Sequence, residues 1–163
     1  MIDKLVQWLV VTPASVFGNL QSLFLFGIRL WVSWDFLKSG WLKVTNWQNT
    51  LFLFQNEYHT PVLPPDVAAV MGAGGELFFP ALLIVGLTSR LGAVGLSAVN
   101  VMAVVSYADV LLSEGFEAAL GQHVMWGFGL VVLVVFGPGK LSLDHLLTRA
   151  PRYAPAMAPA HAV

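Results

Sequence analysis

Residues 66–90 read DVAAVMGAGGELFFPALLIVGLTSR, a run of apolar and small residues long enough to cross a bilayer as one helix. Between Val67 and Thr88 the only charged residue is Glu76. A charge at the bilayer centre costs roughly 2.5–3.5 kcal/mol on insertion scales, so Glu76 needs a partner, a proton or a wet cavity. Arg29 is the basic residue at a similar depth in another apolar stretch. We therefore predict a buried Arg29–Glu76 pair inside a helical bundle.

The composition places the chain in the membrane class. Its 163 residues are 57% hydrophobic and 10% charged, whereas a soluble domain is about one quarter charged. The net charge of −1 gives no clustered basic face, so nucleic acid is not an expected partner. The absence of Cys excludes disulfides, thiol redox chemistry and Cys-bound metal centres. Electrons that pass through this protein would have to travel on a bound molecule or a partner.

Four apolar stretches predict an all-α fold, an integral membrane four-helix bundle with an interfacial N-terminal helix and an extracytoplasmic loop helix. The spans are predicted at 20–38, 67–88, 91–108 and 122–136, with the loop helix inside 40–65. Residues 1–19 are expected to be an interfacial amphipathic segment, with a signal peptide as the alternative. Residues 20–138 would form the bundle. Residues 139–163 would form a cytoplasmic tail with a disordered end.

The distribution of Lys and Arg predicts the orientation. With four spans both termini lie on the same side as the short turn at Arg90. Lys4, Lys140, Arg149 and Arg152 share that side, against Lys38 and Lys43 on the other. By the positive-inside rule the termini are cytoplasmic, in the inner (plasma) membrane of a bacterium.

Helical spacing predicts which polar residues meet. A buried polar core is expected from Arg29, Glu76, Asn100 and Ser97, with Asn100 bonded to Glu76 or Arg29. A second group should gather at the outer mouth of the bundle, with Asp35 and Lys38 close enough to pair. The outer-mouth group comprises Asp35, Lys38, Lys43, Glu57, Tyr58, Asp109 and His123.

Two interpretations of the polar core stay open. Buried polar groups can simply fix the register of packed helices. They can also handle a proton, a quinone headgroup or a substrate. No metal is expected, because the acidic residues near His123 lie in a loop that water can solvate. Haem is not expected either, because the other histidines lie outside the spans. No catalytic residue is assigned, since no nucleophile–base pair or phosphate-binding loop is present.

Several short motifs resemble those of the DoxX family of membrane proteins. They are Arg29-Leu30, then Lys38-Ser39-Gly40 with Lys43 beyond, Glu76 in a Pro-bounded second span, and the exit GLTSR at 86–90. The resemblance covers roughly residues 20–138. The stretch NTLFLFQNEYHTPVLPP is similar to DoxX-like proteins encoded beside small metal-binding peptides and their maturation enzymes. The resemblance implies a four-helix accessory subunit of a membrane redox or metal- and stress-handling complex.

Three functions follow as hypotheses. The first is a DoxX-like accessory subunit, quinone-proximal and without a catalytic centre, which would bind quinone or lipid and contact another subunit or a second copy of itself. The alternative is a small proton-coupled transporter that uses Glu76 as its titrating group. An enzyme in its own right ranks last, and if there is any enzymatic link it is through association with an oxidoreductase.

Overall fold

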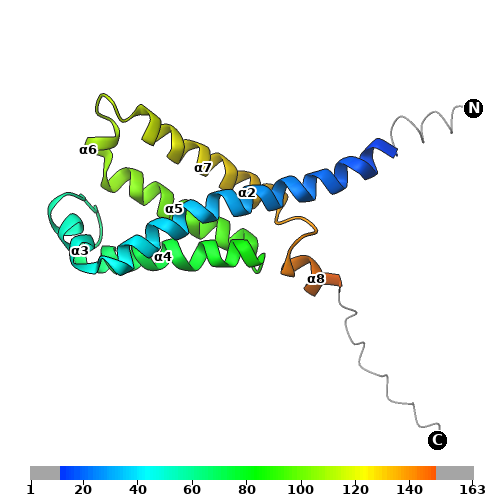
Figure 1. The fold of residues 1–163 in the computed structure, drawn as a ribbon, viewed down its shortest axis with the longest axis horizontal. Coiled ribbons are helices and arrows are strands. Elements are labelled where there is room, and N and C mark those ends of the chain that lie inside the picture. Colours follow the sequence, from blue (N-terminus) through cyan, green and yellow to red (C-terminus); the bar gives the residue numbers. More distant parts are fainter. Residues whose placement is uncertain (1–11, 150–163) are drawn as a thin grey trace, which may run out of the picture.

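The computed structural model describes residues 12–149, and these residues form helices, turns and no strand. The all-helical prediction is therefore confirmed for the described part of the chain. Four long helices form the bundle, a short helix lies in two of the connections, and a third short helix follows the last long one (Figure 1). The helices are α2 (Thr12–Thr45), α3 (Trp47–Asn56), α4 (Pro65–Val85), α5 (Ser89–Ser106), α6 (Ala108–Leu111), α7 (Glu117–Phe136) and α8 (Leu143–Arg149).

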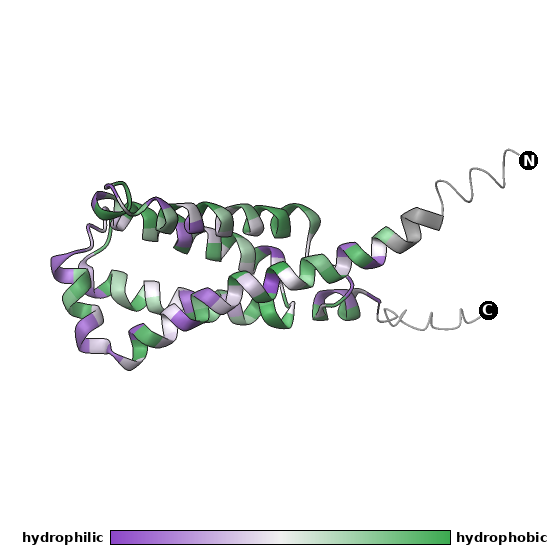
Figure 2. Cartoon of the chain, turned by 45° about the horizontal axis from the view of Figure 1, so that its top comes forward, coloured by the Kyte–Doolittle hydropathy of each residue, from purple (hydrophilic) through white to green (hydrophobic). Residues whose placement is uncertain are grey.

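The four long helices pack as neighbours, α2 mainly against α4 and α5 mainly against α7. Within residues 12–149, three helices are long and apolar enough to cross a membrane: α4, α5 and α7. The longer helix α2 is more polar, because it carries Arg29, Asp35, Lys38 and Lys43. Hydrophilic residues concentrate in the connections around α3 and in α8, whereas the long helices are mostly apolar (Figure 2).

Helix α2 is longer than the predicted span at both described ends. It reaches Thr45 because no Gly–Pro or other breaker follows Lys38, and the lone Gly40 is tolerated inside it. Residues 12–19, predicted to lie in an interfacial segment, continue directly into this helix. Residues 1–11 and 150–163 lie outside the described residues, so the rest of that segment and the end of the tail stay predictions. A helix does occupy the predicted loop region, as α3.

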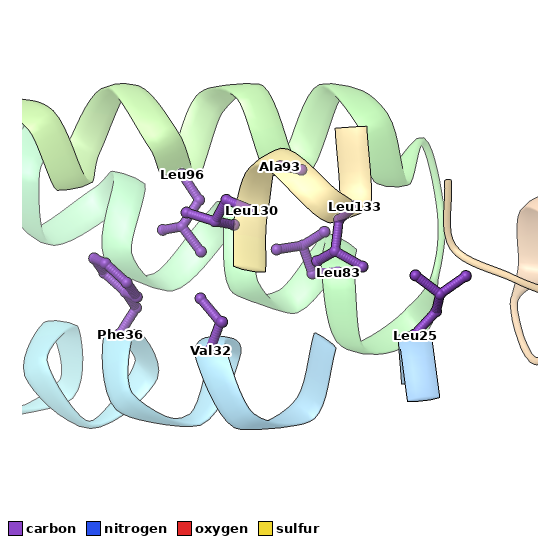
Figure 3. Packing of buried hydrophobic residues seen from close by; sticks show 8 residues of the cluster. All are labelled: Leu25, Val32, Phe36, Leu83, Ala93, Leu96, Leu130 and Leu133. Atoms are coloured by element: carbon purple, nitrogen blue, oxygen red, sulfur yellow. The ribbon is translucent and has the colours of Figure 1, made fainter. Parts of the chain in front are cut away.

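All four long helices contribute to the main hydrophobic core (Figure 3). Fully buried side chains interdigitate there, which is the packing expected of helices in a bundle. The large apolar side chains on the outer surfaces remain exposed, as on helices that face lipid. The core consists of Leu25, Val32, Phe36, Leu83, Ala93, Leu96, Leu130 and Leu133.

A smaller core fixes α3 on the first turns of α4. Phe54 of α3 packs on Ala68 and Ala69, and its ring lies 3.3 Å from the position of a Cβ added at Gly72. The small residues of α4 therefore allow a close approach. Tyr58, just after α3, packs edge-on against Phe54 and so is held beside the bundle.

The end of α4 depends on Gly86. Its φ of +75° is in the left-handed region, and its N–H and that of Leu87 bond to the last-turn carbonyls of Leu82 and Leu83. Glycine is favoured in this conformation at a helix C-terminus. A Cβ at Gly86 would also lie 2.5 Å from Nη2 of Arg29 and 2.6 Å from Cβ of Ser142. Glycine is therefore required at this position for two reasons: its backbone conformation is left-handed, and there is no room for a side chain.

Gly86→Ala should therefore lower the thermal unfolding temperature in detergent by several degrees, since it combines unfavourable φ with displacement of Arg29. Gly74→Ala is the matched control, because an added Cβ at Gly74 meets nothing within 4 Å. The control should leave the unfolding temperature unchanged or raise it, because Ala is the better helix former. Equal unfolding temperatures for the two variants would contradict the prediction.

Candidate functional site

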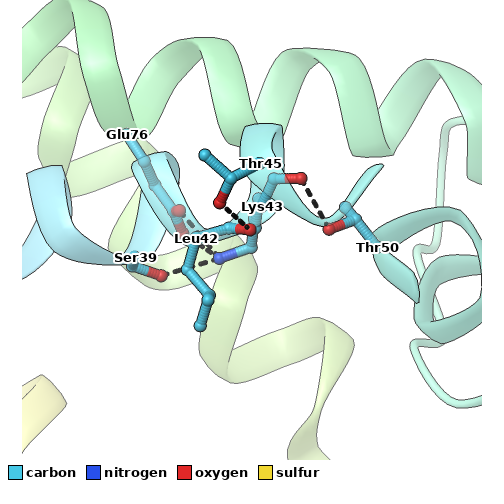
Figure 4. A network of polar contacts seen from close by, with 6 residues as sticks. All are labelled: Ser39, Leu42, Lys43, Thr45, Thr50 and Glu76. Carbon is cyan, nitrogen blue, oxygen red and sulfur yellow. Dashed lines mark hydrogen bonds and ion pairs between the residues drawn. The ribbon is translucent and has the colours of Figure 1, made fainter. Parts of the chain in front are cut away.

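Glu76 is buried near the middle of α4 and pairs with Lys43 of α2 (Figure 4). The ammonium of Lys43 donates to Oε1 of Glu76 at 2.8 Å and to Oε2 at 2.7 Å. It donates as well to Oγ of Ser39, one helical turn earlier, at 2.7 Å. The side chains of Glu76 and Lys43 are 8% and 20% exposed, so the pair is largely removed from solvent. The cost of a charge in the bundle is offset by a bidentate ion pair.

Two neighbours shape the surroundings of Glu76. Gly40 of α2 faces it so closely that an added Cβ would lie 3.0 Å from Cβ of Glu76 and 3.0 Å from the Leu77 side chain. Pro80, fully buried, stands four residues after Glu76 and has no N–H to donate to the Glu76 carbonyl. Close helix contact and a missing main-chain donor therefore coincide at this residue.

The predicted Arg29–Glu76 pair is wrong. Arg29 is buried, but its guanidinium donates to four backbone carbonyls. Nε bonds to Leu83 at 2.6 Å, Nη2 to Ile84 at 2.8 Å, and Nη1 to Pro138 at 3.1 Å and Leu141 at 2.6 Å. Arg29 therefore lies level with the end of α4, and the nearer cation Lys43 neutralises Glu76. Guanidinium can satisfy several fixed acceptors at once because it has five donors in one plane.

Arg29 joins the bundle to residues 138–149, the C-terminal segment. The carbonyls of Leu83 and Ile84 lie in the last turn of α4, where the helix dipole also favours a cation. Asp144 holds the other side of the segment, accepting from the N–H groups of Thr88 and Ser89 at 2.7 and 2.8 Å. Residues 139–149, predicted to begin a tail, pack against the turn between α4 and α5.

The carboxyl of Asp144 stays ionised at this contact. Its partial burial would raise its pKa, but the backbone donors of Ser89 and Thr88 together with the nearby charge of Arg29 outweigh burial and lower the pKa. The ionised form is therefore the one that bonds to the start of α5.

A cavity of about 470 Å³, the bundle cavity, opens beside the Lys43–Glu76 pair. Its walls are mostly apolar side chains of α4 and α5, closed by Phe54 and by the loop after α3. The polar groups that reach it include Ser39, Lys43, Tyr58, Glu76 and His123.

Tyr58 contributes a protonated phenol to the bundle cavity. Burial raises its pKa, and the neighbouring Tyr107, Glu57 and Glu76 raise it further. The ring also packs edge-on against Tyr107 at 5.1 Å between centroids. Its position depends on the connection after α3, which returns to the bundle through a bond from the N–H of His59 to the carbonyl of Ser106.

Asn100 does not contact Glu76 or Arg29, contrary to the prediction. Its side chain bonds to His123 of α7, with Nδ2 donating to the carbonyl at 2.9 Å and Oδ1 lying 2.8 Å from Nδ1 of the ring. Ser97 donates to the carbonyl of Ala93 in its own helix. The four residues of the predicted polar core thus occupy separate places: Arg29 at the C-terminal segment, Glu76 at Lys43, Asn100 at His123, and Ser97 on α5.

The predicted outer-mouth group is also divided. Lys43, Tyr58 and His123 line the bundle cavity. Asp35 and Lys38 form the predicted pair, at 2.8 Å. Glu57 and Asp109 are exposed. Among residues 12–149 no three His, Asp or Glu side chains gather in a way that could hold a metal ion.

Ser39 is a polar partner within the cavity that was not among the predicted site residues. The signal was available, because Ser39 and Lys43 stand four residues apart and face the same side once both lie on one helix. Ending the first span at residue 38 placed Lys43 in a loop and hid this relation.

Either Lys43→Met or Glu76→Gln alone should destabilise the protein by about 3 kcal/mol, because each leaves one buried group without its charged partner. The double variant should recover part of the loss, since neither charge remains. Thermal unfolding in one detergent, arranged as a double-mutant cycle, measures the coupling. Lys38→Met is the control, a change of the same type at a lysine whose side chain is 56% exposed. Additive effects of the two single changes would refute the coupling.

Arg29→Met should leave the C-terminal segment loosely attached, because four backbone carbonyls lose the donor that Arg29 supplies. Each carbonyl left buried and unpaired lowers the stability by about 1–3 kcal/mol. We expect a lower unfolding temperature and faster proteolysis after Lys140 or Arg149. Arg90→Met, at an exposed arginine, is the control. Arg29→Lys should resemble Arg29→Met, because an ammonium has three donors and lacks the planar fork. Unchanged proteolysis in Arg29→Met would disprove the role of Arg29.

Comparisons with known proteins place the chain in a family. Residues 24–109, more than half of the chain, match the DoxX family. An uncharacterized protein of Haemophilus influenzae is similar as well, 29% identical over 127 residues that cover 75% of this chain and 82% of the relative. No solved structure matches. The matched residues include Arg29, Lys43, Glu76 and Asn100. The chain therefore belongs to the DoxX family of membrane proteins.

Proposed function

We propose that this protein is an accessory subunit of a redox or metal- and stress-handling complex, whose bundle cavity binds the headgroup of a quinone or a similar lipid. It would supply a binding site and no catalytic centre of its own. The observation that carries the proposal is the apolar cavity of about 470 Å³ with the buried Lys43–Glu76 pair in its wall.

The size and lining of the cavity support a ligand of this class. Small-molecule sites are commonly about 300–1,000 Å³, mostly apolar, with a few convergent polar groups, and they often lie between the helices of a bundle. A quinone ring presents polar atoms at two opposite edges and apolar faces between them. The apolar walls from α4 and α5 suit the faces, and Glu76, Tyr58 and His123 place hydrogen-bonding groups in the lining.

The position of basic residues supports a bacterial inner-membrane location with cytoplasmic termini. Arg90, Lys140 and Arg149 belong to the same end of the bundle as the contact between Arg29 and the C-terminal segment. The described chain begins and ends beyond that end of the bundle, and α3 lies at the opposite one (Figure 1). Under the positive-inside rule the cavity then opens toward the extracytoplasmic half of the bilayer.

The exposed apolar outer surfaces support contact with another subunit or with a second copy of this chain. Large apolar residues of α7 remain exposed along most of its length, among them Val124, Phe128, Val131 and Val135. Such a face contacts lipid or the apolar face of another membrane protein. The partner, like the ligand, belongs to the proposal.

The proton-coupled transporter is the weaker hypothesis. A carboxyl that carries protons must alternate between its neutral and ionised forms. Both oxygens of Glu76 accept from the Lys43 ammonium, so a fixed cation already occupies the carboxylate. The pair therefore supports ligand binding or structure rather than proton transfer.

Binding of decylubiquinone and of its quinol form to the purified protein in lipid nanodiscs tests the proposal. We expect saturable binding that falls at least about tenfold in the Lys43→Met/Glu76→Gln double variant, because the polar edge of the site is lost. Lys38→Met should bind like the unaltered protein. Unfolding temperatures of all three proteins show whether the variants remain folded.

Absence of saturable binding of both the quinone and the quinol in the unaltered protein would overturn the proposal. Binding that is equal in the double variant and in Lys38→Met would place the ligand elsewhere on the bundle and would equally count against the cavity.

A further inference from the structure

The contact between Asn100 and His123 fixes which nitrogen of the imidazole carries the proton. The Asn100 amide nitrogen faces the carbonyl of His123 at 2.9 Å, and only the NH₂ group can donate there. Oδ1 of Asn100 therefore faces Nδ1 of the ring, at 2.8 Å. An amide oxygen carries no hydrogen, so Nδ1 must be the donor. In the neutral ring, Nε2 is then a bare acceptor.

His123 lines the bundle cavity and is held there from two sides. Asn100 is buried, 5% exposed, and its amide engages both the main chain and the ring of the same residue. The ring also packs edge-on against Trp126 at 5.0 Å between centroids. With Nδ1 engaged, Nε2 is the remaining polar atom of this ring that a ligand in the cavity can address.

The charged pair at the cavity offers acceptors too. An ammonium has three hydrogens, and those of Lys43 are directed to Ser39 and to both oxygens of Glu76. The Glu76 carboxylate retains lone pairs, because each oxygen can accept more than one bond. The hydroxyl of Tyr58 can donate or accept and so does not discriminate between ligands.

We propose that the bundle cavity selects ligands with hydroxyl donors, and so binds a quinol or a similar phenol more tightly than the corresponding quinone. This inference rests on the proposed function and names its substrate class. A quinol hydroxyl can donate to Nε2 of His123 or to the Glu76 carboxylate. A quinone carbonyl in the same place would bring its acceptor oxygen against one of these acceptors, with no hydrogen between them. An acceptor left without a donor in a buried site costs affinity.

Binding of decylhydroquinone, its quinone and its dimethyl ether to the protein in nanodiscs, under anaerobic conditions, tests the selection. We expect the quinol to bind at least about tenfold more tightly than the quinone or the ether. The ether keeps the ring and tail but lacks both donors, so it separates hydrogen bonding from redox state. His123→Phe should reduce the preference for the quinol, and His59→Gln, at a histidine 77% exposed, should leave it unchanged.

Equal affinities for the quinol and its ether would overturn this inference and leave the proposed function standing. If none of the three compounds bound, both would be overturned. A preference that survived in His123→Phe and in Glu76→Gln alike would also refute it, because the selecting acceptors would be elsewhere.

Asn100 is a positioning residue in this proposal, and ¹⁵N NMR of the histidine ring tests it without any ligand. In the unaltered protein His123 should show Nδ1 protonated and Nε2 bare. Its signals are assigned by their loss in His123→Phe. In Asn100→Leu we expect a mixture of tautomers and a weaker preference for the quinol. A bare Nδ1 in the unaltered protein would disprove the assignment of the acceptor.

Discussion

Charged groups within an apolar bundle must be stabilised by the protein itself, and this chain does so in two different ways. Lys43 and Glu76 neutralise each other as an ion pair. Among residues 12–149 no carboxylate forms an ion pair with Arg29, which is satisfied by backbone carbonyls instead. The second solution requires carbonyls that can accept a further hydrogen bond, and these occur where α4 ends and where the chain leaves α7. The positions of both charges are thus tied to the ends and contacts of particular helices.

The need for a partner at Glu76 was predictable from the sequence, and its identity was not. Depth alone suggested Arg29, since both residues lie inside apolar stretches. The actual partner depends on the length of α2 and on how far α2 is displaced along α4. Neither quantity is encoded in the hydropathy of a single segment. Lys43 therefore seemed to belong to a loop, although it lies on the helix and reaches back to Glu76.

Most of the fold followed from hydropathy, with its spans close to α4, α5 and α7, because long apolar runs in a membrane protein have few alternatives to helices. The docking of the C-terminal segment could not be predicted in the same way. Residues 138–149 have little apolar periodicity, and their attachment consists of hydrogen bonds to Arg29 and from Asp144. The pairing of Asn100 with His123 was missed for a related reason: it joins neighbouring helices whose relative rotation only the packed structure defines.

Helices α2 and α4 are fastened together at two levels, at Lys43–Glu76 and again where Arg29 holds the end of α4. Two separated attachments prevent α2 from sliding along α4 or rotating against it. Any movement that accompanies binding of the proposed ligand in the cavity would therefore occur in α5, α7 and the connection after α3. The pair α2–α4 would act as the fixed half of the molecule, and α5–α7 as the half that can yield.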